Sequence, residues 1–165
     1  MRLSKFGPSL VATVVLAVLP LSAPLARDGW HGADRPGARA LFYGALPPKG
    51  RQPNPETIQL MLRCADTGKA IVLFVAETSA KLKPGKKVRV VLSVGKVRSA
   101  VTGETKANQL AGVASLRARF FARARVFKAM TDRRTLRISA GGWHNTTPLK
   151  GIDGRLKHLV ASCQK

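Results

Sequence analysis

The two cysteines constrain the fold of this chain more than any other feature of its sequence. They are Cys64 and Cys163, in a chain of 165 residues. A disulfide between them would close a loop of about 100 residues and contribute up to roughly 4.7 kcal/mol in the chain-entropy model of disulfide stabilisation. The alternative is two unpaired, buried thiols, and the redox state of the protein's compartment distinguishes the two cases.

The N-terminal segment has the layout of a secretory signal peptide. A short region with one arginine and one lysine precedes an apolar run over residues 10–19, and proline, serine and alanine follow it. A transmembrane helix would need roughly 20 apolar residues, about twice the length of this run. We therefore expect residues 1–26 to be a signal peptide, cleaved after Ala26 or Ala23. A periplasmic or secreted protein meets the oxidising conditions in which the two cysteines can pair.

Residues 27–55 read as a leader that precedes the folded domain. They are rich in glycine and proline and have no sustained apolar period. Because proline removes backbone donors and glycine adds conformational entropy, we expect this leader to be flexible or extended. Its aromatic residues, Trp30, Phe42 and Tyr43, are expected to dock on the folded domain, or otherwise on a partner.

From Thr57 onward, apolar runs of strand length alternate with turn signals. Residues 57–64 and 69–77 are two such runs, and Asp66-Thr67-Gly68 between them predicts a β-hairpin turn. Residues 86–94 alternate apolar and basic side chains, which is typical of a half-buried strand. Further strands are expected at residues 96–105, 135–140 and 143–149.

Residues 114–132 combine a strand pattern with a helix pattern. Arg117 and Arg119 fall on one parity, which favours a strand to about Arg119. Phe120 and Phe127 share a helical face in an alanine-rich segment, so we expect a helix from Phe120 to about Asp132.

A second helix is expected after Gly151, with one apolar stripe along it. The stripe consists of Ile152, Leu156, Leu159, Val160 and Cys163. Packing of this helix on the first strand of the domain would bring Cys163 to Cys64, at the end of that strand. We therefore predict an α+β fold with one domain over residues 56–165: a β-rich sandwich-like or antiparallel sheet with one internal helix and a C-terminal helix.

The C-terminal segment also carries a short motif. Its residues are Leu149, Lys150 and Gly151, followed by Leu156, Leu159 and Cys163, with Cys64 far upstream. This arrangement resembles small exported proteobacterial proteins, the invasion-associated locus B proteins and the VasI-type accessory proteins of type VI secretion. The resemblance implies a periplasmic β-rich domain with a C-terminal helix and no established catalytic site.

The formal net charge of +21 at pH 7 limits the class of partner. Such a charge attracts polyanions over a Debye length of about 8 Å at physiological salt. Export favours lipopolysaccharide, capsule or extracellular DNA as the anionic polymer, and the alternative is a solvated basic face without a ligand. Base stacking would need exposed aromatic side chains, and Phe120, Phe121 and Phe127 are expected in the core. The candidate polyanion-binding residues are Lys86, Lys87, Arg89, Arg98, Arg117, Arg119 and Arg125.

The residues that usually carry catalysis are scattered along the sequence. His31, His144 and His158 are far apart, and the cysteines and histidines show no metal-binding spacing. We therefore expect no enzyme activity, no cofactor, no metal and no small-molecule substrate. His144 beside Asn145 is the best remaining catalytic candidate, and a structural turn is its ordinary interpretation.

The functional hypothesis from the sequence is an exported binding or accessory module of the periplasm or cell envelope. It would engage anionic envelope polymers through a basic face. The alternative is a protein–protein adaptor in an envelope or secretion complex, which would use Trp30, Phe42 or Tyr43 of the leader.

Overall fold

The structure is a computed structural model that describes residues 28–46, 54–66, 68–78, 80, 82–108 and 112–164. The signal peptide predicted for residues 1–26 lies outside the described residues, and so does part of the predicted leader. No helix within the described ranges is long and apolar enough to cross a membrane.

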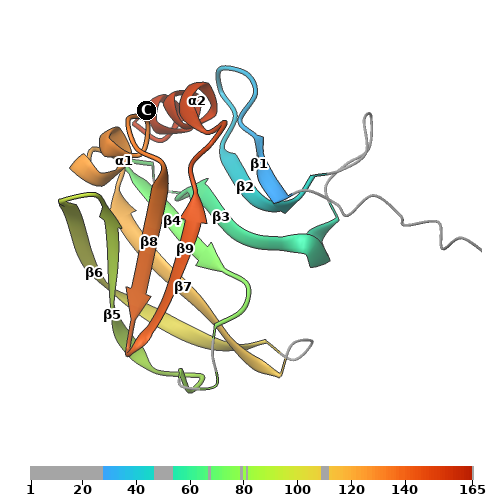
Figure 1. Cartoon of the computed structure of the whole chain (residues 1–165), viewed down its shortest axis with the longest axis vertical. Helices are drawn as coiled ribbons and strands as arrows, with labels where there is room; N and C mark the ends of the chain where they lie inside the picture. The colour runs from blue at the N-terminus through green and yellow to red at the C-terminus, as the bar shows by residue number, and fades with distance from the viewer. Residues whose placement is uncertain are drawn as a thin grey trace, which may run out of the picture.

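The predicted α+β fold is confirmed. In the described part of the chain, nine antiparallel strands form one sheet that nearly closes on itself, and two α-helices cover one end of it (Figure 1). The strands are β1 (Asp28–Gly32), β2 (Ala40–Ala45), β3 (Ile58–Cys64), β4 (Ala70–Val75), β5 (Lys87–Val94), β6 (Val97–Asn108), β7 (Val113–Phe121), β8 (Thr135–Ala140) and β9 (Trp143–Pro148). The helices are α1 (Arg125–Ala129) and α2 (Asp153–Ser162), with a short 3-10 helix at Pro55–Thr57 before β3.

The strands follow one another in the sheet in the order β1-β2-β3-β4-β7-β6-β5-β8-β9. The long strand β6 therefore lies between β7 and β5. The first part of β6 pairs with β5, and the part from Gly103 onward pairs with β7. A Cβ atom on Gly103 would lie 2.6 Å from Cγ2 of Val90 and 2.7 Å from the carbonyl oxygen of Arg117. Only glycine therefore fits at this position.

The core fills the inside of the curled sheet and extends under the helices. Period-2 alternation buries residues such as Leu62, Leu92 and Leu116, while Phe127 of α1 and Leu156 of α2 close the covered end. The hairpin predicted from residues 57–64 and 69–77 is present as β3 and β4.

The predicted disulfide is also confirmed. Cys64 and Cys163 are bonded, with their Cα atoms 5.0 Å apart. The bond joins the end of β3 to the residue that follows α2. β3 is the third strand of the sheet, so the expectation that Cys64 ends the first strand of the domain is wrong.

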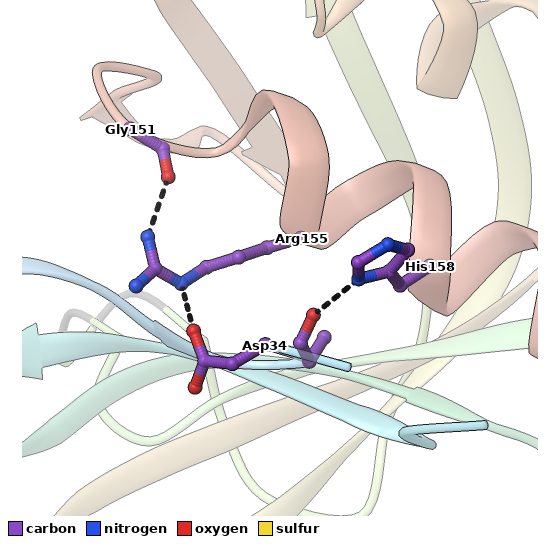
Figure 2. A network of polar contacts seen from close by, with 5 residues as sticks. Asp34, Gly151, Arg155 and His158 are labelled. Atoms are coloured by element: carbon purple, nitrogen blue, oxygen red, sulfur yellow. Dashed lines mark hydrogen bonds and ion pairs between the residues drawn. The ribbon is translucent and has the colours of Figure 1, made fainter. Parts of the chain in front are cut away.

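Polar contacts attach α2 to the loop between β1 and β2, as Figure 2 shows. Arg155 donates from Nε to Asp34 Oδ1 at 2.7 Å and from one terminal nitrogen to the Gly151 carbonyl oxygen at 3.0 Å. Nδ1 of His158 lies 3.1 Å from the carbonyl oxygen of Ala33. The C-terminal helix is therefore held by the disulfide at its end and by the contacts of Arg155 and His158 with the β1–β2 loop.

The prediction of a flexible leader over residues 27–55 is wrong where the structure describes it. β1 and β2 form a hairpin that extends the sheet beyond β3, so the domain takes in residues from 28 onward. Trp30 and Tyr43 are only 4% and 8% exposed, because the inner face of this hairpin packs on the core. Trp30 Nε1 also donates to the carbonyl oxygen of Pro148 at 2.6 Å, which links the two edge strands β1 and β9.

One glycine of this segment has a steric role that the sequence pattern conceals. The register between β2 and β3 shifts at Gly44, where a Cβ atom would clash with the backbone carbonyl of Thr57. Gly44 is therefore a bulge position inside a strand and not a sign of flexibility.

The prediction of a helix from Phe120 to Asp132 is also wrong in its bounds. β7 continues to Phe121, and α1 covers only Arg125–Ala129. The strand parity that buries Leu116 also buries Phe120, whose ring meets Phe127 edge-on at a centroid distance of 6.3 Å. The same parity turns Phe121 outward, so its expected place in the core is wrong.

We expect removal of the disulfide to lower the free energy of unfolding by about 2–5 kcal/mol, because the unfolded chain regains the freedom of a long closed loop. The double variant Cys64→Ser/Cys163→Ser and the oxidised wild-type protein are compared by urea unfolding. The oxidised and chemically reduced wild-type protein serve as a second pair. Equal midpoints and slopes in both comparisons would contradict the expected contribution.

Candidate anion-binding surface

The structure places most of the predicted polyanion-binding residues on the outer face of the sheet. Lys87 and Arg89 on β5, Arg98 on β6, and Arg117 and Arg119 on β7 are all exposed. Each of these side chains follows or precedes a core-facing neighbour, because β-strands alternate the direction of successive side chains. The sheet therefore displays these five basic side chains on its outside.

A groove of about 490 Å³ brings part of this set together. Its cationic lining residues are Arg63, Lys87, Arg117 and Arg119. The strand register explains the grouping. Val72 of β4 pairs with Arg63 on one side and with Arg119 on the other, and Glu104 of β6 pairs with Lys87 and with Arg117. Four cations from three strands, β3, β5 and β7, thus converge on one hollow of the outer face.

Two carboxylates share this groove with the cations. Asp66 lies 3.6 Å from a terminal nitrogen of Arg63, and Glu104 lies 3.7 Å from Nζ of Lys106. Both pairs are largely exposed, so solvent screens them and each contributes little to stability. The groove keeps an excess of positive charge, which suits an anionic ligand.

The remaining candidates lie outside the groove. Arg89 lines a neighbouring hollow with Arg137 and His144, and Arg98 lines another hollow that also contains Arg137. Lys86 precedes β5 in a loop, and Arg125 begins α1.

Two members of this surface, Arg63 and Arg137, are not among the candidate residues predicted from the sequence. Arg63 belongs to the groove because it has the outward parity of β3 and because β3 lies two strands from β7, an order that the sequence does not reveal. Arg137 belongs to the neighbouring hollows because β8 pairs with β5. Alternation within each strand could have found their direction, but only the strand order places them beside the other basic residues.

The histidines do not meet at a catalytic centre. His144 shares its hollow with two arginines and no carboxylate. His158 contacts a backbone carbonyl through Nδ1, and His31 stacks on Phe42 with a centroid distance of 5.6 Å. Within the described ranges, no three side chains of His, Cys, Asp or Glu gather as a metal site.

Comparison with protein-family models, with curated proteins and with solved structures finds no match for this chain. The resemblance of the C-terminal motif to exported accessory proteins therefore stays a prediction, and the fold and its surface carry the functional argument.

The buried side chain of His31 leads us to expect that the stability of the folded protein depends on pH. The side chain is 8% exposed, and neither ring nitrogen has a hydrogen-bond partner among the described residues. Burial lowers the pKa of His31; the backbone of Gly29 opposes this effect, the nearby Arg155 adds to it, and Asp34 opposes it more weakly. The folded protein thus favours neutral His31, whereas the unfolded chain binds a proton near the ordinary pKa of about 6.5.

We expect the free energy of unfolding to be largest above about pH 6.5 and to fall as the pH drops below that value, because protonation then favours the unfolded state. Urea unfolding at about pH 7.5 and about pH 5 measures the difference. His31→Leu should reduce the difference, and His144→Asn, at an exposed site on the β8–β9 hairpin, should preserve it. An unchanged pH dependence in His31→Leu would contradict this account.

Proposed function

We propose that the protein is a binding module of the periplasm or cell surface that engages anionic envelope polymers through the groove on the outer face of the sheet. The observation that carries this proposal is the convergence of Arg63, Lys87, Arg117 and Arg119 on one hollow. Export, which the N-terminal sequence predicts, would put the groove in contact with lipopolysaccharide, capsule or extracellular DNA.

The chemistry of the groove supports a phosphate or sulfate group as the bound unit. Three of its four cations are arginines, whose planar guanidinium groups bind such oxyanions with two parallel hydrogen bonds. Thr102 supplies a hydroxyl group among the lining residues. The positive charge of the whole chain adds a long-range attraction that does not depend on the exact register of the polymer.

The lining residues of the groove include no aromatic side chain on which a nucleic-acid base could stack. Two aromatic residues follow Arg119 in the sequence: Phe120 is buried in the core, and Phe121 lines a different hollow. A polymer recognised by its repeated charges fits this arrangement better than one recognised by base stacking.

The alternative function of a protein–protein adaptor relied on aromatic residues that are buried or partly covered in the structure. Trp30 and Tyr43 are buried in the core of the chain, and Phe42 is partly covered and stacked on His31. These aromatic side chains stabilise the β1–β2 hairpin and do not offer a surface to a partner.

We expect charge reversal in the groove, by Lys87→Glu/Arg117→Glu, to weaken binding to dextran sulfate, lipopolysaccharide and DNA by about tenfold or more. Each lost contact with a phosphate or sulfate group means that one counterion fewer is released from the polymer on binding. The matched control is Lys86→Glu/Arg125→Glu, which makes the same change in charge outside the groove. Fluorescence anisotropy with labelled polymers measures the affinities.

Wild-type affinity should also fall steeply between about 50 mM and about 200 mM salt, and the groove variant should show a shallower slope. Binding that is independent of salt, no binding at low salt, or an equal loss in the control variant would overturn the proposed function.

A further inference from the structure

An apolar groove lies between α1 and α2. These two helices cover one end of the sheet (Figure 1). Its volume is about 820 Å³. α1 packs against β5 and β6, whereas α2 packs against β2 and β3, and the space between the two helices is left open. Ala122, Phe127 and Leu156 form its floor, and the partly exposed Val160 forms one wall.

The rim of this helix groove is strongly basic. Arg123, Lys128 and Lys157 line it and are exposed, against the single carboxylate of Asp132. The ion pairs found among the described residues lie elsewhere and involve none of these three cations. Long basic side chains around apolar surface can keep their charges in water or on phosphate groups while their stems cover the apolar floor. The groove is therefore complementary to a molecule that is apolar at one end and anionic at the other.

Phe121 extends this surface beyond the groove. It is 79% exposed, the more exposed of the two large hydrophobic side chains that lie open in the described residues. It lines an adjoining hollow with Lys69, Arg123 and Gln164, and the last two of these also line the helix groove. An exposed phenylalanine, an apolar groove and a basic rim thus occupy one continuous end of the molecule.

We propose that this end docks on the surface of a bilayer that contains anionic phospholipid. Phe121 enters the headgroup layer, and Lys69, Arg123 and Lys128 approach the phosphates. The docking surface is separate from the groove of Arg63 and Lys87, so this inference goes beyond the proposed function and does not depend on it.

The arrangement favours a bilayer over a folded protein as the occupant. Phe121 projects from the outer face at the end of β7 and is 79% exposed, so a protein partner would have to supply a matching pocket. A bilayer accepts a projecting apolar side chain at any position along its surface. A single apolar side chain binds membranes weakly, and stable docking needs a second signal, which the basic rim provides through its attraction to anionic lipid.

The test is co-sedimentation of the purified, disulfide-bonded protein with large vesicles. One set consists of phosphatidylcholine alone, and in the other phosphatidylglycerol makes up about a third of the lipid, which supplies the negative surface potential. We expect binding to the anionic vesicles and little binding to the neutral ones. Phe121→Ser should weaken it by about tenfold, because the apolar contribution is lost. Lys128→Glu/Lys157→Glu should weaken it by about tenfold or more, because two cations become anions.

Matched controls separate docking at this end from attraction by the overall charge. Leu46→Ser removes the other exposed large hydrophobic side chain, at the far end of β2, and Lys83→Glu/Lys86→Glu makes the same charge reversal in the loop before β5. Both controls should bind anionic vesicles within about twofold of wild type. Losses in the controls that equal those of the test variants would overturn the proposal, and so would a lack of binding to anionic vesicles at low salt.

Binding of soluble dextran sulfate distinguishes this proposal from the function proposed above. Phe121→Ser should retain that binding in full, because the variant removes no charge. Loss of vesicle binding with retained dextran sulfate binding supports a separate docking surface. A parallel loss of both would show that Phe121 acts in the polymer-binding groove, and it would contradict the present proposal.

Discussion

The attachment of α2 to β3 is the constraint on which the rest of the structure depends. α2 spans Asp153–Ser162, and an isolated helix of this length is marginal in water. Its buried side chains Leu156 and Leu159 close the covered end of the curled sheet, and the bond from Cys64 to Cys163 fixes it there. The contacts of Arg155 and His158 with the β1–β2 loop tie the same helix to the edge hairpin. Core closure, hairpin docking and the groove between the helices therefore all rely on one helix being in place.

The sequence predicts the parts of this fold that depend on local patterns. The alternation in residues 86–94, the turn between β3 and β4 and the apolar stripe of α2 each reflect a single element, and each is found in the structure. The disulfide was predictable because the stripe directs Cys163 to the core and because the predicted export would permit oxidation. The length of α1 was not predictable in this way, since Phe120 fits a strand and a helix equally well until β4 pairs with β7.

The hairpin of β1 and β2 shows why composition gave a wrong prediction of a flexible leader for residues 27–55. Glycine and proline usually indicate loops, but Gly44 stands at a bulge where the Thr57 carbonyl leaves no room for a side chain. Trp30 and Tyr43 then supply enough buried apolar surface to fix the hairpin on the core. A steric requirement that comes from a neighbouring strand cannot be recognised from the local sequence around the glycine.

For both candidate surfaces, the sequence pattern predicts the direction of single side chains, and the tertiary structure determines which side chains lie together. The outward direction of Arg117 and Arg119 follows from parity, but their approach to Arg63 follows from a strand order that joins distant segments. The exposure of Phe121 follows from the strand continuing past Phe120, and its place beside the helix groove follows from the packing of α1 and α2. In both cases the residue types were visible in the sequence, and tertiary structure determined which of them lie together.

The central claim is that Cys64 and Cys163 form a disulfide in the protein's native location. Titration of thiols with Ellman's reagent, on unfolded and unreduced protein taken from its native location, tests this link directly. The structure predicts that no thiol reacts before a reductant is added and that both Cys64 and Cys163 react afterwards. Two reactive thiols per chain before reduction would contradict it.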